Sequence, residues 1–350
     1  MTSGMRGAVA RLGTASFLFA ATFFASGYFA YGPRADEAPR YDLPIDCTPG
    51  ETCWIVNYAD QEAGKLARDY TCGPQTYDGH TGTDFAVRNL RAMRGGVAVV
   101  ASAPGVVRAT RDGVADRRLE RGAPADAPEV SGRECGNGVV IDHGAGWETQ
   151  YCHLRRGSVA VSKGERVERA APLGLVGLSG RTEFPHVHLT VRHQGRNIDP
   201  FTGRAAPAGC ALSGESLWTA AAAAALQYRP VSIYDAGVAG EAPSVAQIHE
   251  GEDLAPARRA SPALALWAAL YGLQAGDELE LSLADPGGRV LFERRRRIER
   301  TQARRVELAS LPRAARMWPA GRYRALVRVT RPRAEGAPLA VERILVVELE

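Results

Sequence analysis

Short apolar runs separated by glycine-rich turns fill the first half of the chain. Five of these runs are β-branched or alternate with period two, as half-buried strands do, and turn residues bound them. They cover residues 97–102, 106–109, 139–142, 148–154 and 187–192. No long helical period occurs among them, but a polar segment at 112–132, with several Ala, Pro and Arg, interrupts the series. The pattern predicts a β domain with an insertion or long loop at that segment.

A second block begins near residue 212 and alternates more regularly. Residues 278–283 have a strict period of two, the turn Asp285-Pro286-Gly287-Gly288 follows, and 289–293 has the pattern of a return strand. Every second residue from Tyr323 to Val329 is apolar or aromatic, and residues 341–349 form a further strand-like run. Together these runs predict a small antiparallel sandwich.

Two segments of this block admit more than one interpretation. Arg294 to Arg297 could form a patch for an anionic polymer, although a solvated strand end and loop is the favoured interpretation. The alanine-rich run at 219–226 fits either a short helix or a linker, and both remain open.

The chain has 350 residues, enough for two domains with sizeable cores. We expect a mainly β fold with four parts: an N-terminal segment at 1–32, a spacer at 33–46, a first β domain at 47–211 with its core at 72–201, and a sandwich-like β domain at 212–350.

The N-terminal segment has the pattern of an export signal. Arg6 and Arg11 precede an uncharged run at 12–31 that is rich in Phe and Ala. Ala25-Ser26-Gly27 is small enough for signal peptidase, but the whole run would also reach across a bilayer core of about 30 Å. A cleaved signal peptide and a single membrane anchor therefore both remain open, and both place the rest of the chain outside the cytoplasm.

Composition excludes several classes of protein. Hydrophobic residues make up 45% of the chain and charged residues 23%, which excludes disorder along the whole length and a polytopic membrane protein. The net charge is +4, and Lys65 and Lys163 are the only lysines, so arginine supplies nearly all the positive charge. That small, dispersed excess does not indicate a nucleic-acid binder.

Two histidine motifs carry the candidate chemistry. His80 and Asp84 lie four residues apart in Gly-His-Thr-Gly-Thr-Asp, a loop entering a strand, and they converge on one ion only if the turn folds back. In the strand after Pro185, a period of two puts His186, His188 and Thr190 on one face and apolar residues on the other. Metal binding or acid–base chemistry explains this pair of imidazoles better than packing does.

The remaining histidines differ in what surrounds them. His153 ends the second arm of a predicted hairpin, where Thr149, Tyr151 and His153 are expected to share a face. His143 is expected to hold the hairpin turn by hydrogen bonds, whereas His193 and His249 have no partner motif and are expected to be structural or on the surface.

In combination and order, these motifs resemble the zinc metallopeptidases of the LytM/lysostaphin type, peptidase family M23. The matching stretches are His80-x-x-x-Asp84, Tyr151-x-His153-Leu154, residues 161–167, residues 172–181, Pro185-His186-x-His188-Leu189 and Asp199-Pro200. The resemblance covers about residues 72–201. The chain departs from the family's pattern in the insertion at 112–132, in its cysteines, and in Phe184, where the family often has a small polar residue.

The resemblance implies an antiparallel LytM-type peptidase domain at 47–211 that binds one Zn²⁺ per chain. It assigns the ligand roles to His80, Asp84 and His188, and non-ligand catalytic roles to His153 and His186. Two imidazoles and one carboxylate leave a fourth position for water, as in catalytic zinc sites. Which of the two other histidines takes the proton stays open.

The function implied is an exported zinc metalloendopeptidase of the bacterial periplasm or envelope that hydrolyses peptide cross-links of peptidoglycan with zinc-activated water. The other partners expected are an envelope protein at the C-terminal domain, no nucleic acid, and a membrane only through residues 12–31 if these stay uncleaved. Two alternatives remain: a zinc-binding but inactive module that binds wall or activates another hydrolase, and an amidase that cuts between sugar and peptide.

Six cysteines in an exported chain predict disulfides rather than a second metal site or free thiols. Cys135 precedes the first arm of the hairpin and Cys152 lies near the end of the second, so a fold at 143–146 brings the two within bonding reach. Cys47, Cys53, Cys72 and Cys210 would then pair among themselves in an order that the sequence leaves open.

Overall fold

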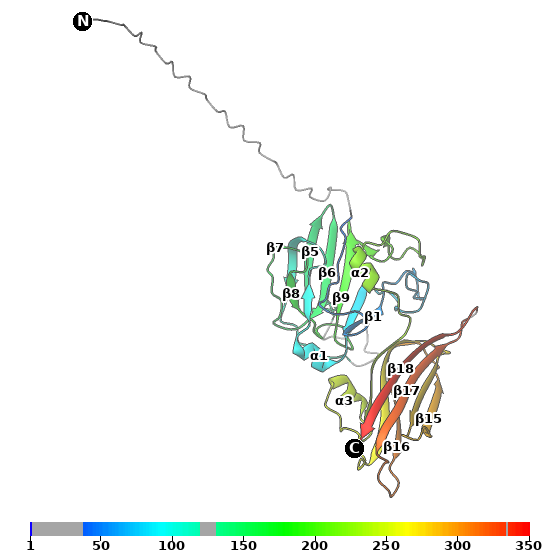
Figure 1. The fold of residues 1–350 in the computed structure, drawn as a ribbon. Coiled ribbons are helices and arrows are strands. Elements are labelled where there is room, and N and C mark those ends of the chain that lie inside the picture. Colours follow the sequence, from blue (N-terminus) through cyan, green and yellow to red (C-terminus); the bar gives the residue numbers. More distant parts are fainter. Residues whose placement is uncertain (2–37, 120–130, 334) are drawn as a thin grey trace. The chain divides into compact units, whose positions relative to one another are not determined.

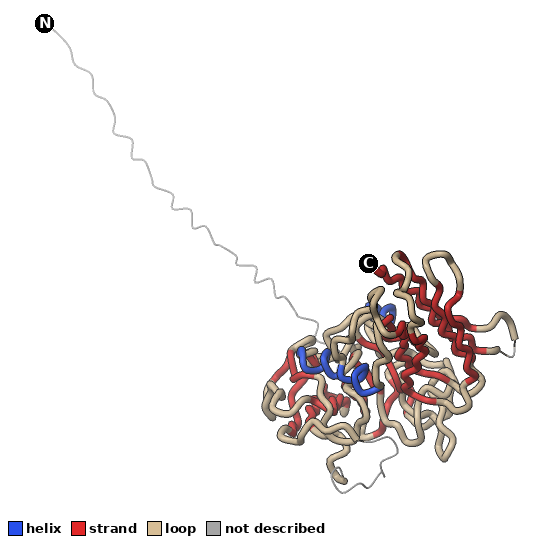
Figure 2. Tube along the Cα trace, turned by 90° about the horizontal axis from the view of Figure 1, so that it is seen from below, coloured by secondary structure: helices blue, strands red, loops and turns tan. Residues whose placement is uncertain are grey.

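The computed structural model describes residues 1, 38–119, 131–333 and 335–350, of which residues 38–350 form one compact unit (Figure 1). Strands make up most of its regular structure, and the helices are few and short (Figure 2). The expected export segment at 12–31 and residues 120–130 of the expected insertion lie outside the described residues. Within the described ranges, no helix is long and apolar enough to cross a membrane.

One antiparallel sheet dominates the first half of this unit. Its strand order is β1-β2-β9-β6-β5-β4-β7, and β10 and β11 extend it from β9. The bounds are Cys53–Asn57 (β1), Thr83–Val87 (β2), Gly105–Arg111 (β4), Asn137–Gly144 (β5), Trp147–Leu154 (β6), Arg166–Val167 (β7), His186–His193 (β9), Arg196–Asp199 (β10) and Arg204–Ala205 (β11). A separate pair joins Ala98–Val100 (β3) to Pro172–Leu175 (β8). All five strands predicted in this half are present, within a few residues of their expected bounds.

The period of two in β9 divides the sheet into two faces. Val187, Leu189 and Val191 are fully buried in the core of the first half, where they pack with residues such as Phe85 and Ile141. The opposite side of the same strand therefore carries its histidines. The division of faces predicted for this strand is confirmed.

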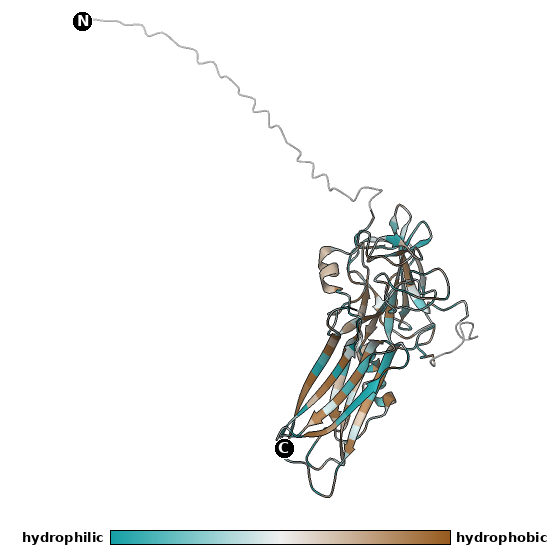
Figure 3. Ribbon diagram, turned by 90° about the vertical axis from the view of Figure 1, so that its right-hand side faces the viewer, coloured by the Kyte–Doolittle hydropathy of each residue, from teal (hydrophilic) through white to brown (hydrophobic). Residues whose placement is uncertain are grey.

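The second half forms two further antiparallel sheets. One has the order β12-β13-β16, with bounds Ser232–Ala239, Ala263–Leu273 and Gln302–Pro312. The other has the order β15-β14-β17-β18, with bounds Val290–Arg297, Glu278–Ala284, Gly321–Arg331 and Leu339–Leu349. A single apolar cluster takes side chains from both sheets, and the strands change between hydrophobic and hydrophilic residues along their length (Figure 3). The mainly β fold with a C-terminal β sandwich is therefore as predicted.

Three details of the structure were left open by the sequence or not predicted from it. The strands β12, β13 and β16 have no clean alternation; β13, for example, is almost entirely apolar because its residues enter two different clusters. The alanine-rich run is a short helix, Ala220–Ala225 (α2), which Thr219 caps through its side chain. Two more short helices lie at Leu90–Gly95 (α1) and Val245–Glu250 (α3).

The expectation of a loop at Arg294 to Arg297 is wrong. These residues continue β15, pair with residues 278–281 of β14, and have exposed side chains. Carboxylates oppose this row of positive charges: Arg295 lies near Glu280 and Glu293, and Arg296 near Glu307. The expected solvated strand end is confirmed, because β15 ends at Arg297, but the expected loop does not begin before that residue.

A third apolar cluster contains residues from both halves. Trp54, Val56 and Phe184 pack there with Tyr234 and Tyr271, among other residues. The contacts among residues 38–350 group them into one unit and show no division between residues 211 and 212. The domain boundary expected there stays a prediction.

Three disulfides close loops around the first sheet. Cys135 and Cys152 are bonded as predicted, with their Cα atoms 4.8 Å apart. The turn of the hairpin lies at Ala145 and Gly146, both with positive φ, which is the tight connection that keeps β5 and β6 in register. The other four cysteines pair as Cys47 with Cys53 and Cys72 with Cys210.

Candidate metal centre and catalytic site

His80, Asp84 and His188 meet at the junction of β2 and β9. Asp84 and His188 are direct partners across the antiparallel pair, and His80 lies in the turn just before β2. Oδ1 of Asp84 lies 3.1 Å from Nε2 of His80 and 2.8 Å from Nδ1 of His188, and the two ring nitrogens are 3.1 Å apart. All three residues are buried. The turn therefore folds back as the ligand hypothesis requires.

Glycine makes this close approach sterically feasible. A Cβ atom on Gly82 would lie 2.2 Å from the carbonyl oxygen of Leu189 and 2.7 Å from Nε2 of His188. Only a residue without a side chain fits between β9 and the turn that carries His80. The Gly-rich character of the motif is thus a packing requirement of the site.

Neighbouring groups orient each of the three side chains. The Nδ1–H of His80 donates to the carbonyl of Tyr58 at 2.6 Å, and Nδ2 of Asn57 donates to Oδ2 of Asp84 at 2.8 Å. Nε2 of His188 lies 2.9 Å from Oγ1 of Thr190. In each of the three side chains, one polar atom makes an orienting hydrogen bond. A second polar atom points toward the other two side chains. Metal-binding histidines and carboxylates in proteins are oriented in this way, by hydrogen bonds from the polar atoms that do not face the metal.

The donor set fits zinc. Two imidazole nitrogens and one carboxylate oxygen are ligands that zinc accepts, at bond lengths that put neighbouring ligand atoms about 3.3 Å apart in a tetrahedral site. The three separations here, 2.8 to 3.1 Å, are close to that spacing. Among the described residues, these three also form the one group of His, Cys, Asp or Glu side chains whose ligand atoms are clustered tightly enough for a metal ion.

Electrostatics within the cluster favour an ionised carboxylate. Burial alone would raise the pKa of Asp84, but the adjacent His80 and His186 hold it well below its usual range. Burial opposes the charged form of His80, and the Asp84 carboxylate nevertheless raises the pKa of that ring. Burial lowers the pKa of His188 despite its hydrogen bond with Asp84. The carboxylate is thus the fixed negative charge of the site.

His153 and His186 lie beside this cluster. Their ring centroids are 4.6 Å apart, and the ring of His153 is 6.1 Å from that of His188. The Nδ1–H of His153 donates to the carbonyl of Ser179 at 2.8 Å, and that of His186 donates to the carbonyl of Phe184 at 2.9 Å. Each ring therefore keeps Nε2 as its proton-accepting atom. In His186 this atom lies 3.4 Å from Oδ1 of Asp84.

The expectation that Thr149, Tyr151 and His153 share a face holds for Thr149 and Tyr151, whose hydroxyls lie 3.2 Å apart, and is wrong for His153. Tyr151 pairs with Leu189 and packs in the core, where its hydroxyl accepts a hydrogen bond from the amide of Ser102. His153 has φ +64°, so at this residue the backbone leaves the extended conformation in which side chains alternate between the two faces. Its ring consequently joins the histidines of β9 instead of following Tyr151 into the core.

The other three histidines have different surroundings. His143 bonds through its two ring nitrogens to the carbonyl of Pro104 and to the hydroxyl of Thr149. The ring of His193 stacks on Trp147 at 4.2 Å. His249 bonds to Arg118, a residue of the first half of the chain. None of these rings is part of the metal-ligand cluster found among the described residues.

A pocket of about 270 Å³ opens beside the site. It is lined by Asn57, Tyr77, Asp84, Leu119, Arg181, Thr182, Glu183, Phe184, His186 and Ala303. Asn57 and Ala303 were missed by sequence reasoning, because neither lies in a recognisable motif. Ala303 belongs to β16, so a strand of the C-terminal block contributes to the wall of the candidate site.

Comparison with known proteins gives a family and several relatives. Residues 78–200 match peptidase family M23. The chain is 35% identical over 120 residues to the peptidoglycan DD-endopeptidase ShyA of Vibrio cholerae. This match covers 34% of this chain and 22% of that protein. It is 34% identical over 94 residues to the DD-carboxypeptidase/endopeptidase Mpg of Neisseria meningitidis. This match covers 27% of this chain and 19% of that protein.

A solved structure of a zinc-containing peptidase from Vibrio cholerae is also similar. The match covers 46% of this chain and 39% of that chain, with 24% sequence identity and a TM-score of 0.32. In the curated relatives, the matched region spans about a fifth of each protein's length.

Proposed function

We propose that this chain is an exported zinc metalloendopeptidase that hydrolyses peptide cross-links of bacterial peptidoglycan. The premise is the match of residues 78–200 to peptidase family M23. The observation that carries the proposal is the convergence of His80, Asp84 and His188 beside two further imidazoles. The named activities of the similar proteins, both peptidoglycan or DD-peptide hydrolases by name, support the choice of substrate.

The ligands we propose are Nε2 of His80, Oδ1 of Asp84 and Nδ1 of His188. When bound there, zinc would supply Lewis-acid activation of water and of the scissile carbonyl. The chain's own contribution is to hold three donor atoms in place through the carbonyl of Tyr58, the amide of Asn57 and the hydroxyl of Thr190.

We propose that His153 and His186 accept the proton of the attacking water and return it to the departing amine. Burial, together with the nearby His186 and His188, lowers the pKa of His153 well below its usual value, so the ring is neutral and can accept a proton at Nε2. An imidazole that has taken the proton of the attacking water becomes a cation, and it can return that proton to the departing amine. The carbonyls of Ser179 and Phe184 keep both rings in the tautomer that this role needs.

Export is supported by two features of the chain. The uncharged run at 12–31 follows two arginines, which is the pattern of a signal peptide or anchor. The three disulfides require an oxidising compartment. We therefore propose that the protein acts in the periplasm or cell envelope of a bacterium.

Digestion of purified peptidoglycan followed by mass spectrometry tests the proposal. The wild-type chain with zinc should split cross-linked dimers into monomeric stem peptides, and a chelator should stop the reaction. His188→Ala should be inactive, whereas His193→Ala, on the same strand but stacked on Trp147, should keep activity. Release of intact stem peptides would instead indicate an amidase, and no new fragments would indicate an inactive module.

A further inference from the structure

The described start of the expected insertion lies along the loop that orients both proposed catalytic histidines. Backbone contacts join residues 116–119 to residues 178–182: an antiparallel bridge between Asp116 and Ser179, and hydrogen bonds from the amides of Arg117 and Leu119 to the carbonyls of Leu178 (3.0 Å) and Thr182 (2.9 Å). Residues 116–119 thus pair with the loop much as a neighbouring strand would. The insertion is also a point at which the chain departs from the usual pattern of the family.

The side chain of Asp116 strengthens this pairing close to His153. Its Oδ1 accepts a hydrogen bond from the amide of Leu178 at 2.7 Å, and its Oδ2 accepts one from the amide of Arg156 at 2.9 Å. Leu178 precedes Ser179, whose carbonyl accepts the hydrogen bond from the His153 ring. Asp116 therefore ties the stretch of chain that follows His153 to the stretch that supplies the acceptor for its ring.

The other end of residues 116–119 is linked to His186. The carbonyl of Thr182 accepts the amide of Leu119, and the hydroxyl of Thr182 donates to the carbonyl of Phe184 at 2.7 Å. The same Phe184 carbonyl accepts the Nδ1–H of His186, and Oγ1 of Thr182 lies 3.1 Å from that nitrogen. One short segment is therefore connected to the hydrogen-bond acceptors of both rings.

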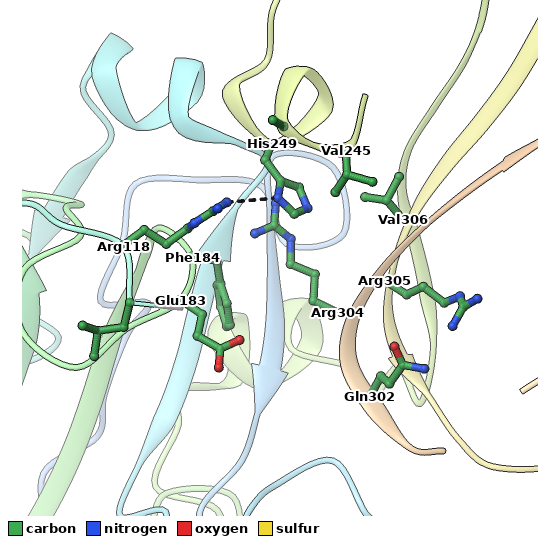
Figure 4. Close-up of a pocket in the computed structure, with 11 residues that line it drawn as sticks. Arg118, Glu183, Phe184, Val245, His249, Gln302, Arg304, Arg305 and Val306 are labelled. Atoms are coloured by element: carbon green, nitrogen blue, oxygen red, sulfur yellow. Dashed lines mark hydrogen bonds between the residues drawn. The ribbon is translucent and has the colours of Figure 1, made fainter. Parts of the chain in front are cut away.

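A contact with the C-terminal block holds this segment in place. Figure 4 shows the side chain of Arg118 directed at His249 of α3, and the guanidinium donates to Nδ1 of that ring at 3.2 Å. Burial, together with Arg304 and Arg118, lowers the pKa of His249 to about 4, so the ring is neutral at pH 7 and can accept this bond. Leu119 is buried. Residues 116–119 are thus fixed both to the loop and to the second half of the chain.

We propose that Asp116 is a positioning residue for the proposed catalytic histidines, and that residues 116–119 set the positions of both rings. The inference rests on the proposed function and adds a support that the insertion supplies. Proton transfer depends steeply on distance and orientation, so a small displacement of a ring slows turnover. Ser179 is also held through its hydroxyl, which donates to the carbonyl of Leu154 at 2.7 Å. Loss of Asp116 should therefore displace His153 rather than release it.

Steady-state kinetics on a synthetic cross-linked dimer of stem peptides tests this role. Asp116→Ala should lower kcat about tenfold, because the ring of His153 moves relative to the reacting water. KM should stay within about twofold and zinc content should be unchanged, since Asp116 is neither a proposed ligand nor among the described residues that line the pocket beside the site. Asp116→Asn keeps an acceptor for the amide of Leu178, so its kcat should lie between those of the wild type and Asp116→Ala.

Asp112→Ala is the matched control. Asp112 lies at the start of the same insertion, and its carboxylate also accepts backbone amides, those of Gly157 at 2.7 Å and Val159 at 3.2 Å. Neither of these residues supplies an acceptor to a histidine ring of the site, so Asp112→Ala should keep the wild-type kcat. Thermal unfolding shows that each variant is folded. Wild-type kcat in Asp116→Ala, or an equal fall in Asp112→Ala, overturns the inference.

Nuclear magnetic resonance of the zinc-loaded protein with isotope-labelled histidine separates the two proposals, because it needs no turnover. The Nδ1–H proton of His153 should be protected from solvent exchange in the wild type by the carbonyl of Ser179. It should exchange faster in Asp116→Ala and stay protected in Asp112→Ala. Unchanged exchange in Asp116→Ala would refute the positioning role, even in a protein that cleaves peptidoglycan. Faster exchange there, in a protein whose wild type cleaves no dimer, would refute the proposed function and leave Asp116 as the support of the His153 ring.

Discussion

At the scale of single residues, His153 holds a conformation that its position in a strand does not favour. A φ of +64° is uncommon for a residue with a side chain and costs of order 1 kcal/mol or more. The amide of His153 donates to the carbonyl of Cys135 and its ring to the carbonyl of Ser179, and these bonds maintain the conformation. The result is an imidazole placed beside His186 by a local backbone turn.

The five histidine and aspartate variants should separate into two groups. His80→Ala, Asp84→Ala and His188→Ala each remove one of the three proposed ligand atoms, so zinc content and hydrolysis should both fall to background. His153→Ala and His186→Ala should keep about one zinc per chain and lose most turnover, by about 100-fold or more, as expected for groups that move a proton. Metal analysis of the purified variants alongside peptidoglycan digestion is the measurement. Zinc content near zero in His153→Ala would show that the roles are wrongly assigned.

Asn57 should affect the metal without touching it. Its amide donates to Oδ2 of Asp84, whereas Oδ1 of that carboxylate lies near the two proposed histidine ligands. Asn57→Ala should weaken zinc binding about 10-fold to 100-fold, since the carboxylate loses the group that orients it. Competition with a chromophoric chelator measures the affinity, and activity should return when zinc is added in excess. Unchanged zinc affinity would mean that strand pairing alone orients Asp84.

At the scale of elements, the hairpin β5–β6 and its disulfide position His153. Cys152 immediately precedes the histidine, and Cys135 both bonds to Cys152 and accepts the hydrogen bond from the histidine amide. The disulfide therefore fixes the segment whose backbone leaves the strand pattern. None of the three proposed zinc ligands lies on either arm of this hairpin.

Removal of this disulfide should reduce turnover but not metal content. A Cys135→Ser, Cys152→Ser double variant should keep stoichiometric zinc, because all three proposed ligands lie on β2, β9 and the turn before β2. Its kcat should fall, since the loop that holds His153 gains freedom. The matched control is the double serine variant of Cys47 and Cys53, which removes a disulfide from a segment that does not carry His153. Equal losses of kcat in both double variants would contradict a specific role for the hairpin.

What the sequence predicts at this scale depends on whether an element has two different faces. β9 and β14 alternate because one face is apolar, so their bounds and orientation were predictable. β13 packs against two clusters and has no polar face, so its period is lost. The orientation of His153 depends on one dihedral angle, and the role of Asn57 depends on a contact between residues 27 positions apart in sequence. Neither of these leaves a periodic signal.

At the scale of the whole molecule, the C-terminal block belongs to the environment of the site. Tyr271 is fully buried, stacks on Tyr234 at 4.0 Å, and lies 6.1 Å from the ring of Phe184. Phe184 in turn supplies the carbonyl that accepts the hydrogen bond from His186. A chain of packed aromatic rings therefore connects the second half of the molecule to a proposed catalytic residue.

Tyr271→Ala should consequently reduce turnover as well as stability. Removing a buried aromatic side chain typically costs about 3 to 5 kcal/mol, and here it also withdraws the support behind Phe184. Tyr323→Ala is a matched control, because Tyr323 is equally buried but packs within the core of the C-terminal sandwich. Both variants should have a lower Tm, and zinc content should be unchanged in both.

The two tyrosine variants should differ in kcat. Measured well below either Tm, kcat should fall at least several-fold in Tyr271→Ala, because the Phe184 carbonyl no longer holds the His186 ring in one orientation. It should stay near the wild-type value in Tyr323→Ala, whose cavity lies inside the sandwich. If both variants kept wild-type kcat, the C-terminal block would be a module whose packing does not influence the catalytic residues. A fall confined to Tyr271→Ala would show that the proposed catalytic site depends on the packing of the C-terminal block, which lies outside residues 78–200, the region that matches the family.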